Sequence, residues 1–385
     1  MLVESIFWLS LFLIGYIYGG YYFILKVIAI GKKANPKEKR RETLPETPPP
    51  LSVIIAAYNE EDRIAQRIND LVALDYPEEK LQMIVASDGS SDRTAAMALS
   101  SRDTRVRVLD FRQNRGRAAV HNDAVEASSG DILVFTDAET RFDPQFLRNV
   151  IPHFLDESVG CVVGNLVYRT ENNAVAEAES FYWKFEKKLR KLESDLGILA
   201  TATGACMAVR KNLWKKLGTT DDVDFVTPLD IIVQGNRVFF STEAFAYDVP
   251  PQSMKSEFHT RIRQTSRNLV GTLRRWTWPY WIKYPVISWV LISHKILRWL
   301  TPYFLLAVLL TNAFLFNKHP IYAVFFGCQV FFYLLAAFGY ISIKRNIKIP
   351  LLSSIFSFFI ANIGMAIGVL NALIGRIPAI YKKAE

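Results

Sequence analysis

The chain has 385 residues, of which 50% are hydrophobic, and it carries a formal net charge of +9. Its mean hydropathy of +0.13 is high for a water-soluble enzyme, and its length accommodates one large domain or two ordinary ones. The three cysteines, Cys161, Cys206 and Cys328, form no Cys-x-x-Cys pair, which argues against a disulfide framework and a zinc site.

An apolar segment opens the chain. Residues 6–25 carry no charge and match the roughly 20 residues that a helix needs to cross a bilayer. Glu4 is the only charged side chain before this run, and no small-residue cleavage site follows it. Residues 1–31 are therefore predicted to be a membrane anchor rather than a signal peptide.

A basic, proline-bearing linker follows at residues 32–50. Its first part, KKANPKEKRR, holds six basic side chains against one acid. By the positive-inside rule this segment is cytoplasmic, which places the N-terminus outside and the next domain in the cytoplasm. Because the positive charge flanks membrane segments, nucleic-acid binding is disfavoured as the reason for the basic composition.

Residues 51–250 have the pattern of a water-soluble α/β domain. The predicted strands cover 51–59, 81–90, 106–111 and 131–139, and the helices between them cover 60–74, 92–101 and 116–128. This alternation predicts a doubly wound, mostly parallel sheet with helices on both faces. Ligands of such sheets bind at the carboxyl ends of the strands, where Asn59, Asp88 and Asp137 fall.

The chain is less regular after residue 140. Residues 174–194 are predicted to be helical, 203–211 to be a loop that enters a short strand, and 221–240 to hold a helix and a strand. Residues 258–276 place apolar side chains on one helix face and arginines mostly elsewhere, which is typical of a helix on a membrane surface. Residues 251–298 are therefore predicted to be interfacial, with a soluble helix packed on the core as the alternative.

Residues 299–385 contain three further apolar runs, at 299–316, 321–343 and 349–375. With the N-terminal run they predict four membrane-spanning helices. Four spans leave the basic C-terminal RIPAIYKK outside, against the positive-inside rule. One C-terminal run is therefore a candidate for a re-entrant or interfacial helix.

Asp137 and Glu139, at the exit of the fourth predicted strand, are candidate ligands for a divalent cation. Mg²⁺ and Mn²⁺ take few protein carboxylates and complete their coordination with substrate phosphates. The alternative is that both acids are turn and cap residues. Other polar residues at strand ends or on the basic helix favour a ligand site: Asn59, Glu60, Asp88, Asp221, Asp222, Asp224, Gln264 and Arg267.

The ordered motifs YNEE, SDGSSDRT, DAE, DDVDF and QTSRN, followed by apolar helices, resemble those of the family 2 glycosyltransferases of the GT-A fold. This family includes membrane-integrated synthases of cellulose, hyaluronan and poly-N-acetylglucosamine, and glycolipid glucosyltransferases. The resemblance covers residues 50–275, and five motifs in order make it specific. The chain has no Gly-x-Gly-x-x-Gly or Walker A motif, which disfavours dinucleotide and P-loop folds.

The resemblance implies a pocket for a nucleoside diphosphate sugar. Ala57, Tyr58 and Glu60 would line the base and ribose, and Asp88 would bind one of these two groups. The implied base is uracil, so the implied donor is a UDP-sugar.

The resemblance also implies the reacting residues. Asp137 and Glu139 would hold Mg²⁺ or Mn²⁺ on the diphosphate, with Glu139 in place of the usual second aspartate of the D-x-D motif. Asp222 would be the catalytic base for the acceptor hydroxyl, with Asp224 in support, and Gly204 would lie in a loop that borders the acceptor. The implied reaction inverts the anomeric carbon.

Gln264 and Arg267 match a Gln-x-x-Arg-Trp element near the diphosphate and the acceptor. Asn268 stands where processive synthases have tryptophan, although Trp276 or Trp278 could substitute for it. Because of this departure, and because the predicted spans are few for a polymer channel, transfer of one sugar to a lipid or lipid-linked acceptor is favoured over processive synthesis.

We therefore expect an integral membrane glycosyltransferase of a bacterial or archaeal plasma membrane, with a cytoplasmic catalytic domain. Its partners would be a nucleotide sugar, membrane lipids, and a lipid, polyprenyl-phosphate or glycan acceptor, with no nucleic acid. A processive polysaccharide synthase is the alternative. A non-catalytic sugar-nucleotide-binding subunit is disfavoured by the intact Asp88, Asp137 and Asp222, and a channel by the lack of ionisable residues in the last two apolar runs.

Overall fold

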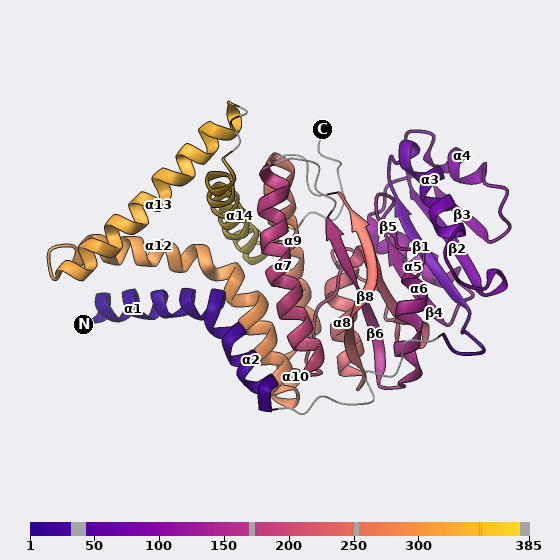
Figure 1. Cartoon of the computed structure of the whole chain (residues 1–385), viewed down its shortest axis with the longest axis horizontal. Coiled ribbons are helices and arrows are strands. Elements are labelled where there is room, and N and C mark those ends of the chain that lie inside the picture. The colour runs from indigo at the N-terminus through magenta and orange to yellow at the C-terminus, as the bar shows by residue number, and fades with distance from the viewer. Residues whose placement is uncertain (32–43, 169–173, 250–253, 346, 348, 378–385) are drawn as a thin grey trace.

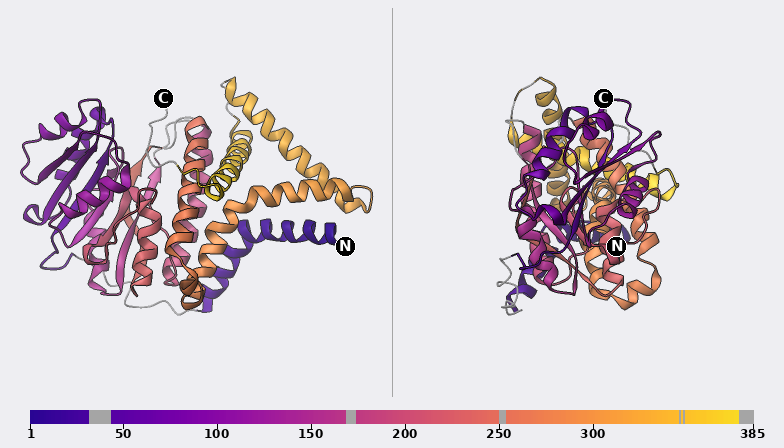
Figure 2. Two further views of the ribbon diagram at one scale, coloured as in Figure 1. Left: turned by 180° about the vertical axis from the view of Figure 1, so that it is seen from behind. Right: turned by 90° about the vertical axis from the view of Figure 1, so that its right-hand side faces the viewer.

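The computed structural model describes the chain except residues 32–43, 169–173, 250–253, 346, 348 and 378–385. The KKANPKEKRR segment and most of RIPAIYKK lie outside the described residues. Figure 1 shows a sheet domain at one end and apolar helices at the other. Two long helices, α7 (Ala174–Asp195) and α9 (Met254–Arg275), stand between these parts, as the view from behind in Figure 2 also shows.

One mixed sheet organises the domain, with the strand order β3-β2-β1-β4-β7-β6-β8-β5. The strands are β1 (Leu51–Ala57), β2 (Leu81–Asp88), β3 (Val106–Phe111), β4 (Ile132–Thr136), β5 (Arg141–Phe142), β6 (Val159–Tyr168), β7 (Met207–Arg210) and β8 (Arg237–Asp248). The first four strands in this order are parallel, and β7 is antiparallel to both of its neighbours. The predicted mostly parallel sheet is confirmed.

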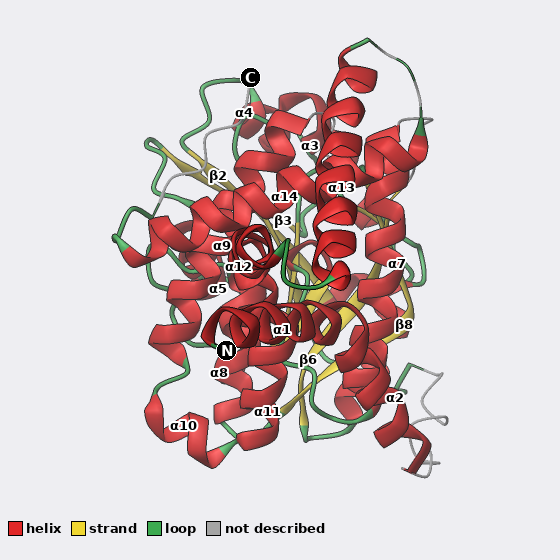
Figure 3. Cartoon of the chain, turned by 90° about the vertical axis from the view of Figure 1, so that its left-hand side faces the viewer, coloured by secondary structure: helices red, strands yellow, loops and turns green. Residues whose placement is uncertain are grey.

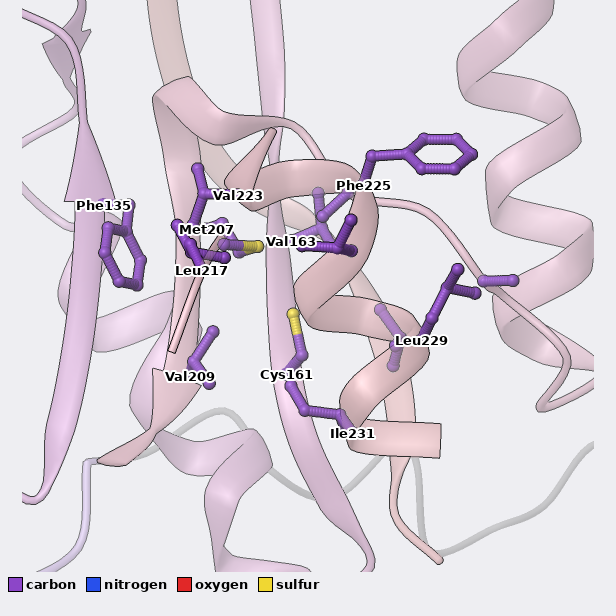
Figure 4. Close-up of a cluster of buried hydrophobic side chains, with 14 of the residues drawn as sticks. Phe135, Cys161, Val163, Met207, Val209, Leu217, Val223, Phe225, Leu229 and Ile231 are labelled. Atoms are coloured by element: carbon purple, nitrogen blue, oxygen red, sulfur yellow. The ribbon is translucent and has the colours of Figure 1, made fainter. Parts of the chain in front are cut away.

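Helices cover both faces of this sheet. They are α3 (Glu61–Val72), α4 (Thr94–Leu99), α5 (Arg117–Glu126), α6 (Phe146–Val150) and α8 (Val223–Val233). The central strands are apolar on both sides because both faces are covered, and two hydrophobic clusters fill the space between sheet and helices. Figure 4 shows part of one cluster, in which Phe135 and Cys161 of the sheet gather with Leu229 of α8.

The sequence did not predict β6, although it is among the longest strands. Gly160 and Gly164 interrupt its apolar pattern, and both are required by close packing. A Cβ at Gly160 would lie 2.6 Å from the side chain of Ile231, and a Cβ at Gly164 would lie 2.6 Å from that of Phe146. Because these contacts come from distant helices, the sequence pattern alone does not reveal them.

Within the described residues, four helices are long and apolar enough to cross a membrane, which is the number predicted, but the second begins at Pro285, inside the segment 251–298 that was predicted to be interfacial. The first, Leu2–Gly31, comprises α1 (Leu2–Gly15), the π-helical turn η1 (Tyr16–Gly20) and α2 (Tyr21–Gly31), and the second, Pro285–Leu315, comprises α11 (Pro285–Val290), the π-helical turn η7 (Leu291–Ile296) and α12 (Leu297–Leu315). The others are α13 (Pro320–Lys344) and α14 (Pro350–Leu373), and Figure 3 shows all of them from their own side of the molecule. Large apolar side chains such as Phe314 and Phe331 remain exposed on them, which suits contact with lipid.

The last apolar helix, α14, packs lengthwise on α9. A Cβ at Gly364 would lie 2.9 Å from the Cβ of Arg261, and a Cβ at Gly368 would lie 2.7 Å from that of Thr265. Since both contacts advance by four residues on each helix, the two helices run in the same direction. Glycine at these positions allows this close approach.

Candidate active site

The loops that follow β1 and β2 brace each other at the carboxyl edge of the sheet. Asn59 has a left-handed backbone (φ 55°), which asparagine tolerates better than most residues. Its side-chain oxygen accepts a hydrogen bond from the Ser91 backbone amide at 2.8 Å, and the Asn59 backbone amide donates to Ser90 Oγ at 3.2 Å. The Glu60 amide donates to Thr94 Oγ1 at 2.8 Å, so the two loops form one rigid rim.

The predicted base and ribose contacts occupy different depths of this rim. Ala57 is only 1% exposed and faces the core, whereas Tyr58 and Glu60 are partly exposed. The carboxylate of Glu60 pairs with Arg63 at 3.0 Å. Tyr58 and Glu60 are thus placed to meet a ligand, and Ala57 supports the strand beneath them.

Asp88 is a buried anchor for the loop after β3. Its two carboxylate oxygens accept hydrogen bonds from the amides of Arg115, at 2.8 Å, and Gly116, at 3.0 Å. Burial raises the pKa of Asp88, and these hydrogen bonds oppose the rise. The side chain is 5% exposed, so it shapes the pocket mainly through this loop, and its direct contact with a base or ribose stays a prediction.

Asp137 and Glu139 lie on the same edge, directly after β4, and each pairs with an arginine. Arg117, at the start of α5, forms an ion pair with Asp137. Arg63, on α3, lies 3.4 Å from Glu139. Burial and the charge of Asp137 raise the pKa of Glu139. Neither arginine was predicted from the sequence. Arg117 follows the predicted strand at 106–111, and Asp137 and Glu139 end the predicted strand at 131–139.

A third carboxylate, Asp248, lies near these two and was also missed. It ends β8, and its Oδ2 accepts a hydrogen bond from Thr140 Oγ1 at 3.4 Å. Burial and the charges of Glu139 and Asp137 raise the pKa of Asp248 to about 7. The contact between Asp248 and Thr140 could not be predicted from the sequence pattern, because it depends on β8 pairing with the short strand β5.

These oxygen donors fit Mg²⁺ or Mn²⁺, which prefer carboxylate and phosphate ligands. Within the described residues, no three His, Cys, Asp or Glu side chains form a closed metal site. A cation held by Asp137 and Glu139 would therefore complete its coordination with groups from a substrate or from water. The metal shared with a diphosphate stays a prediction.

Asp222 and Arg267 form an ion pair at the start of α8, in which Arg267 is buried and Asp222 is partly exposed. Asp222 is the N-cap residue of α8, and its Oδ1 lies 3.0 Å from Arg267 Nε. The same guanidinium donates to the carbonyls of Thr220, at 3.1 Å, and Asp221, at 2.9 Å. Arg267 is 2% exposed, so in this structure it holds the Asp222 loop, and its expected place near the diphosphate and the acceptor stays a prediction. Gln264, one turn earlier on α9, is exposed.

Asp224 and Gly204 lie against each other, and their expected roles at the acceptor stay predictions. A Cβ at Gly204 would lie 3.5 Å from the Cβ of Asp224, and the Ala202 amide donates to the Asp224 carbonyl at 3.0 Å. Burial and the charge of Asp222 raise the pKa of Asp224 to about 6, while Arg117 lowers it. Arg117 also contacts Asp137, so the charge of one guanidinium acts on both groups of carboxylates.

A separate cavity of about 830 Å³ lies at the opposite edge of the sheet. Asp131, Ile132 and Arg210 line it, at the start of β4 and the end of β7. It contains none of the predicted site residues, and Arg210 is already bonded to the carbonyl of Val159 at 2.8 Å. The carboxyl edge is therefore the better candidate for chemistry.

Comparisons with known proteins agree with this geometry. The sequence model of the family described as "Glycosyl transferase family 2" matches residues 52–218. A poly-beta-1,6-N-acetyl-D-glucosamine synthase of Staphylococcus aureus is 26% identical over 222 residues, which cover 55% of this chain and 53% of that protein. The synthase of the same name from Staphylococcus epidermidis is 24% identical over 252 residues, 63% of this chain and 59% of that protein. The chain thus matches between half and three fifths of the length of these relatives.

A solved structure has a similar fold over the whole chain. It is the mannosyltransferase PcManGT from Pyrobaculum calidifontis, in complex with GDP-Man and Mn²⁺. The TM-score is 0.71 at 21% sequence identity, and the similarity covers 97% of this chain and 99% of that one. Residues 52–218 thus match glycosyl transferase family 2, the chain has the same GT-A fold as PcManGT, and its described residues include four helices that are long and apolar enough to cross a membrane.

Proposed function

We propose that this protein is an inverting glycosyltransferase that moves one sugar from a nucleoside diphosphate sugar to a lipid or lipid-linked acceptor. The observation that carries the proposal is that two groups of carboxylates, Asp137 with Glu139 and Asp222 with Asp224, are under the charge of the same guanidinium, Arg117, which forms an ion pair with Asp137. One group suits a metal-bound diphosphate, and the other suits deprotonation of an acceptor.

The charges of these residues determine which part of the reaction each one would assist. Departure of the nucleoside diphosphate builds negative charge, which Arg117 and Arg63 are placed to stabilise. A Mg²⁺ or Mn²⁺ ion on Asp137 and Glu139 would supply further positive charge to the same diphosphate. Asp222 would take the proton of the acceptor hydroxyl, and its contact with Arg267 keeps it oriented.

A lipid acceptor at the cytoplasmic face of a bacterial or archaeal plasma membrane fits the arrangement of helices. The apolar helix α14 packs directly on α9, which carries Arg267 and hence the Asp222 loop. An acceptor held in the membrane would therefore approach the base side of the site without leaving its lipid environment. A UDP-sugar is the expected donor from the sequence motifs, and a GDP-sugar is the donor to test beside it, because PcManGT was solved with GDP-Man.

A processive polysaccharide synthase is the second candidate. The similarity to poly-beta-1,6-N-acetyl-D-glucosamine synthases favours it. Asn268, in place of the family's tryptophan, and the four candidate spans favour single transfer.

The test is to incubate the purified protein with a panel of UDP- and GDP-sugars, Mn²⁺ and a lipid extract, and to identify products by mass spectrometry. A lipid carrying one added sugar supports the proposal, and a ladder of sugars supports the synthase. Absence of any product with every donor, despite a correctly folded protein, would contradict glycosyl transfer.

A further inference from the structure

A buried charged network connects α7 to the second apolar helix. Glu186 of α7 is 1% exposed. Its carboxylate pairs with Arg190 Nε at 3.1 Å on the same helix, with Lys295 Nζ at 3.1 Å, and with Arg298 Nη1 at 2.8 Å. His294 Nε2 also lies 3.1 Å from it. Buried charges in such a number persist only when their partners are fixed in place, so the network couples α7 tightly to this apolar helix.

His294 bridges two carboxylates of α7. Its Nδ1 lies 2.7 Å from Glu193 Oε1, and its Nε2 faces Glu186. Both ring nitrogens thus face carboxylate oxygens of α7. Tyr21 of the first apolar helix also donates to Glu193 Oε1, at 2.9 Å. Two apolar helices thus hold one face of α7.

Both apolar helices change to a π-helical turn at this contact. Tyr16, which opens η1, hydrogen-bonds through its hydroxyl to Ser293 Oγ of η7 at 2.7 Å. Trp289 Nε1 donates to the same hydroxyl at 2.9 Å. π-Helical turns are frequent at functional sites, and these two lie directly before Tyr21 and around His294.

The other end of the network reaches the candidate active site. Arg190 Nη1 hydrogen-bonds to Thr203 Oγ1, and the guanidinium lies 5.1 Å from the centre of the Trp183 ring. Thr203 directly precedes Gly204, which lies against Asp224: a Cβ at Gly204 would be 3.5 Å from the Asp224 Cβ. Arg190 therefore ties the loop at residues 201–206 to α7 and, through Glu186, to the apolar helices.

We propose that Arg190 is a positioning residue for the acceptor side of the site, which sets the loop at residues 201–206 against Asp224 and is itself held by Glu186 and His294. This inference rests on the proposed function. It assigns to the apolar helices a role beyond anchorage. Their packing on α7 holds the Arg190 guanidinium in place, and that guanidinium holds the loop at residues 201–206. The donor side, at Asp137 and Glu139, lies outside this chain of contacts.

The alternative is that the network only stabilises the fold. A variant that keeps the shape of the Thr203 side chain but removes its hydroxyl distinguishes this alternative from a positioning role. Thr203→Val removes the hydroxyl that Arg190 contacts and leaves every ion pair in place. Thr203→Ser restores a hydroxyl at that position. Lys191→Gln, one residue after Arg190, is the matched control because Lys191 is exposed and pairs only locally, with Asp195.

The experiment compares these variants and Arg190→Gln in acceptor kinetics, donor binding and thermal unfolding. We expect Thr203→Val and Arg190→Gln to lower kcat/KM for the acceptor by roughly tenfold, with nucleotide affinity by calorimetry unchanged within twofold. Thr203→Ser should recover most of the loss, and the double variant should be no worse than Arg190→Gln, because both changes break one contact.

A second readout needs no activity. Hydrogen exchange of the amides at residues 200–207 should be faster in Thr203→Val and Arg190→Gln, and unchanged in Lys191→Gln. Unaltered exchange and acceptor kinetics in Thr203→Val would overturn the inference, as would additive losses in the double variant. If the wild-type protein transfers no sugar, the proposed function fails while the exchange measurement still decides the role of Arg190.

Discussion

Single residues at the carboxyl edge take roles that their chemistry explains. Asp222 is partly exposed and held by a buried arginine, which suits a base that must be oriented toward its substrate. Asp88 is buried and bonded to main-chain amides, which suits an anchor. The sequence motifs identified both acids, but only the fold reveals which one reaches solvent.

Asp222→Asn should lower the rate of transfer by at least about 10²-fold, because an amide cannot accept the proton of the acceptor hydroxyl. Nucleotide binding should stay within a few-fold of the wild-type value. Rates from the product assay and affinities from calorimetry check this, with Ser91→Ala, at an exposed turn, as a nearly silent control. An equal loss of nucleotide affinity would count against the role of base.

Asp224 should make stability depend on pH. Its pKa is raised to about 6 in the folded chain from the ordinary value of 3.8, so its stabilising contribution is present below about pH 4 and is lost as the pH rises through 6. Asp224→Asn should remove this dependence. The free energy of unfolding of Asp224→Asn, relative to that of the wild-type protein, should therefore rise by roughly 2 kcal/mol between pH 4 and 7. Unfolding by denaturant at both pH values, followed by tryptophan fluorescence, measures the difference. If the difference in unfolding free energy between Asp224→Asn and the wild-type protein stayed constant with pH, this prediction would be contradicted.

Helices and strands differ in how well the sequence predicted them. The alternation of β1 to β4 with α3 to α5 was predicted because each strand is a short apolar run and each helix has its own periodic face. The edge strand β5 has two residues, and β6 contains two glycines that serve contacts from α6 and α8. Asp248 was missed for the same reason, since its neighbours are brought to it by pairing between strands far apart in sequence.

The contact between α14 and α9 should be sensitive to one methyl group. In Gly368→Ala the new Cβ would lie 2.7 Å from the Cβ of Thr265 and 2.9 Å from the Ile262 carbonyl, so the helices must separate. Overpacking of this kind costs about 1–3 kcal/mol. We expect a lower thermal midpoint and, because α9 carries Arg267, slower transfer.

The matched control for this change is Gly327→Ala on α13, where nothing lies within 4 Å of the added Cβ. It should leave both the thermal midpoint and the rate of transfer unchanged. If both variants behaved alike, the close packing of α14 on α9 would not matter for either property.

At the scale of the whole molecule, the sheet domain and the apolar helices meet through α7 and α9 (Figure 1). The four apolar helices were predictable from length and hydropathy alone. The buried charges that join them to α7 were not, because Glu186, Glu193 and His294 are unremarkable in sequence and meet only in the fold. The donor side of the site depends on the sheet, and the acceptor side depends on both parts.

The central claim is that Asp137 and Glu139 bind a divalent cation together with a nucleoside diphosphate. Titration calorimetry of the full chain with UDP or GDP, in the presence and absence of Mn²⁺, tests it most directly. We expect binding that requires Mn²⁺ in the wild-type protein and in Asp131→Asn, whose side chain lies at the opposite edge of the sheet. In Asp137→Ala the Mn²⁺-dependent part of the affinity should be lost. Equal Mn²⁺-dependent affinity in Asp137→Ala and the wild-type protein would contradict the account.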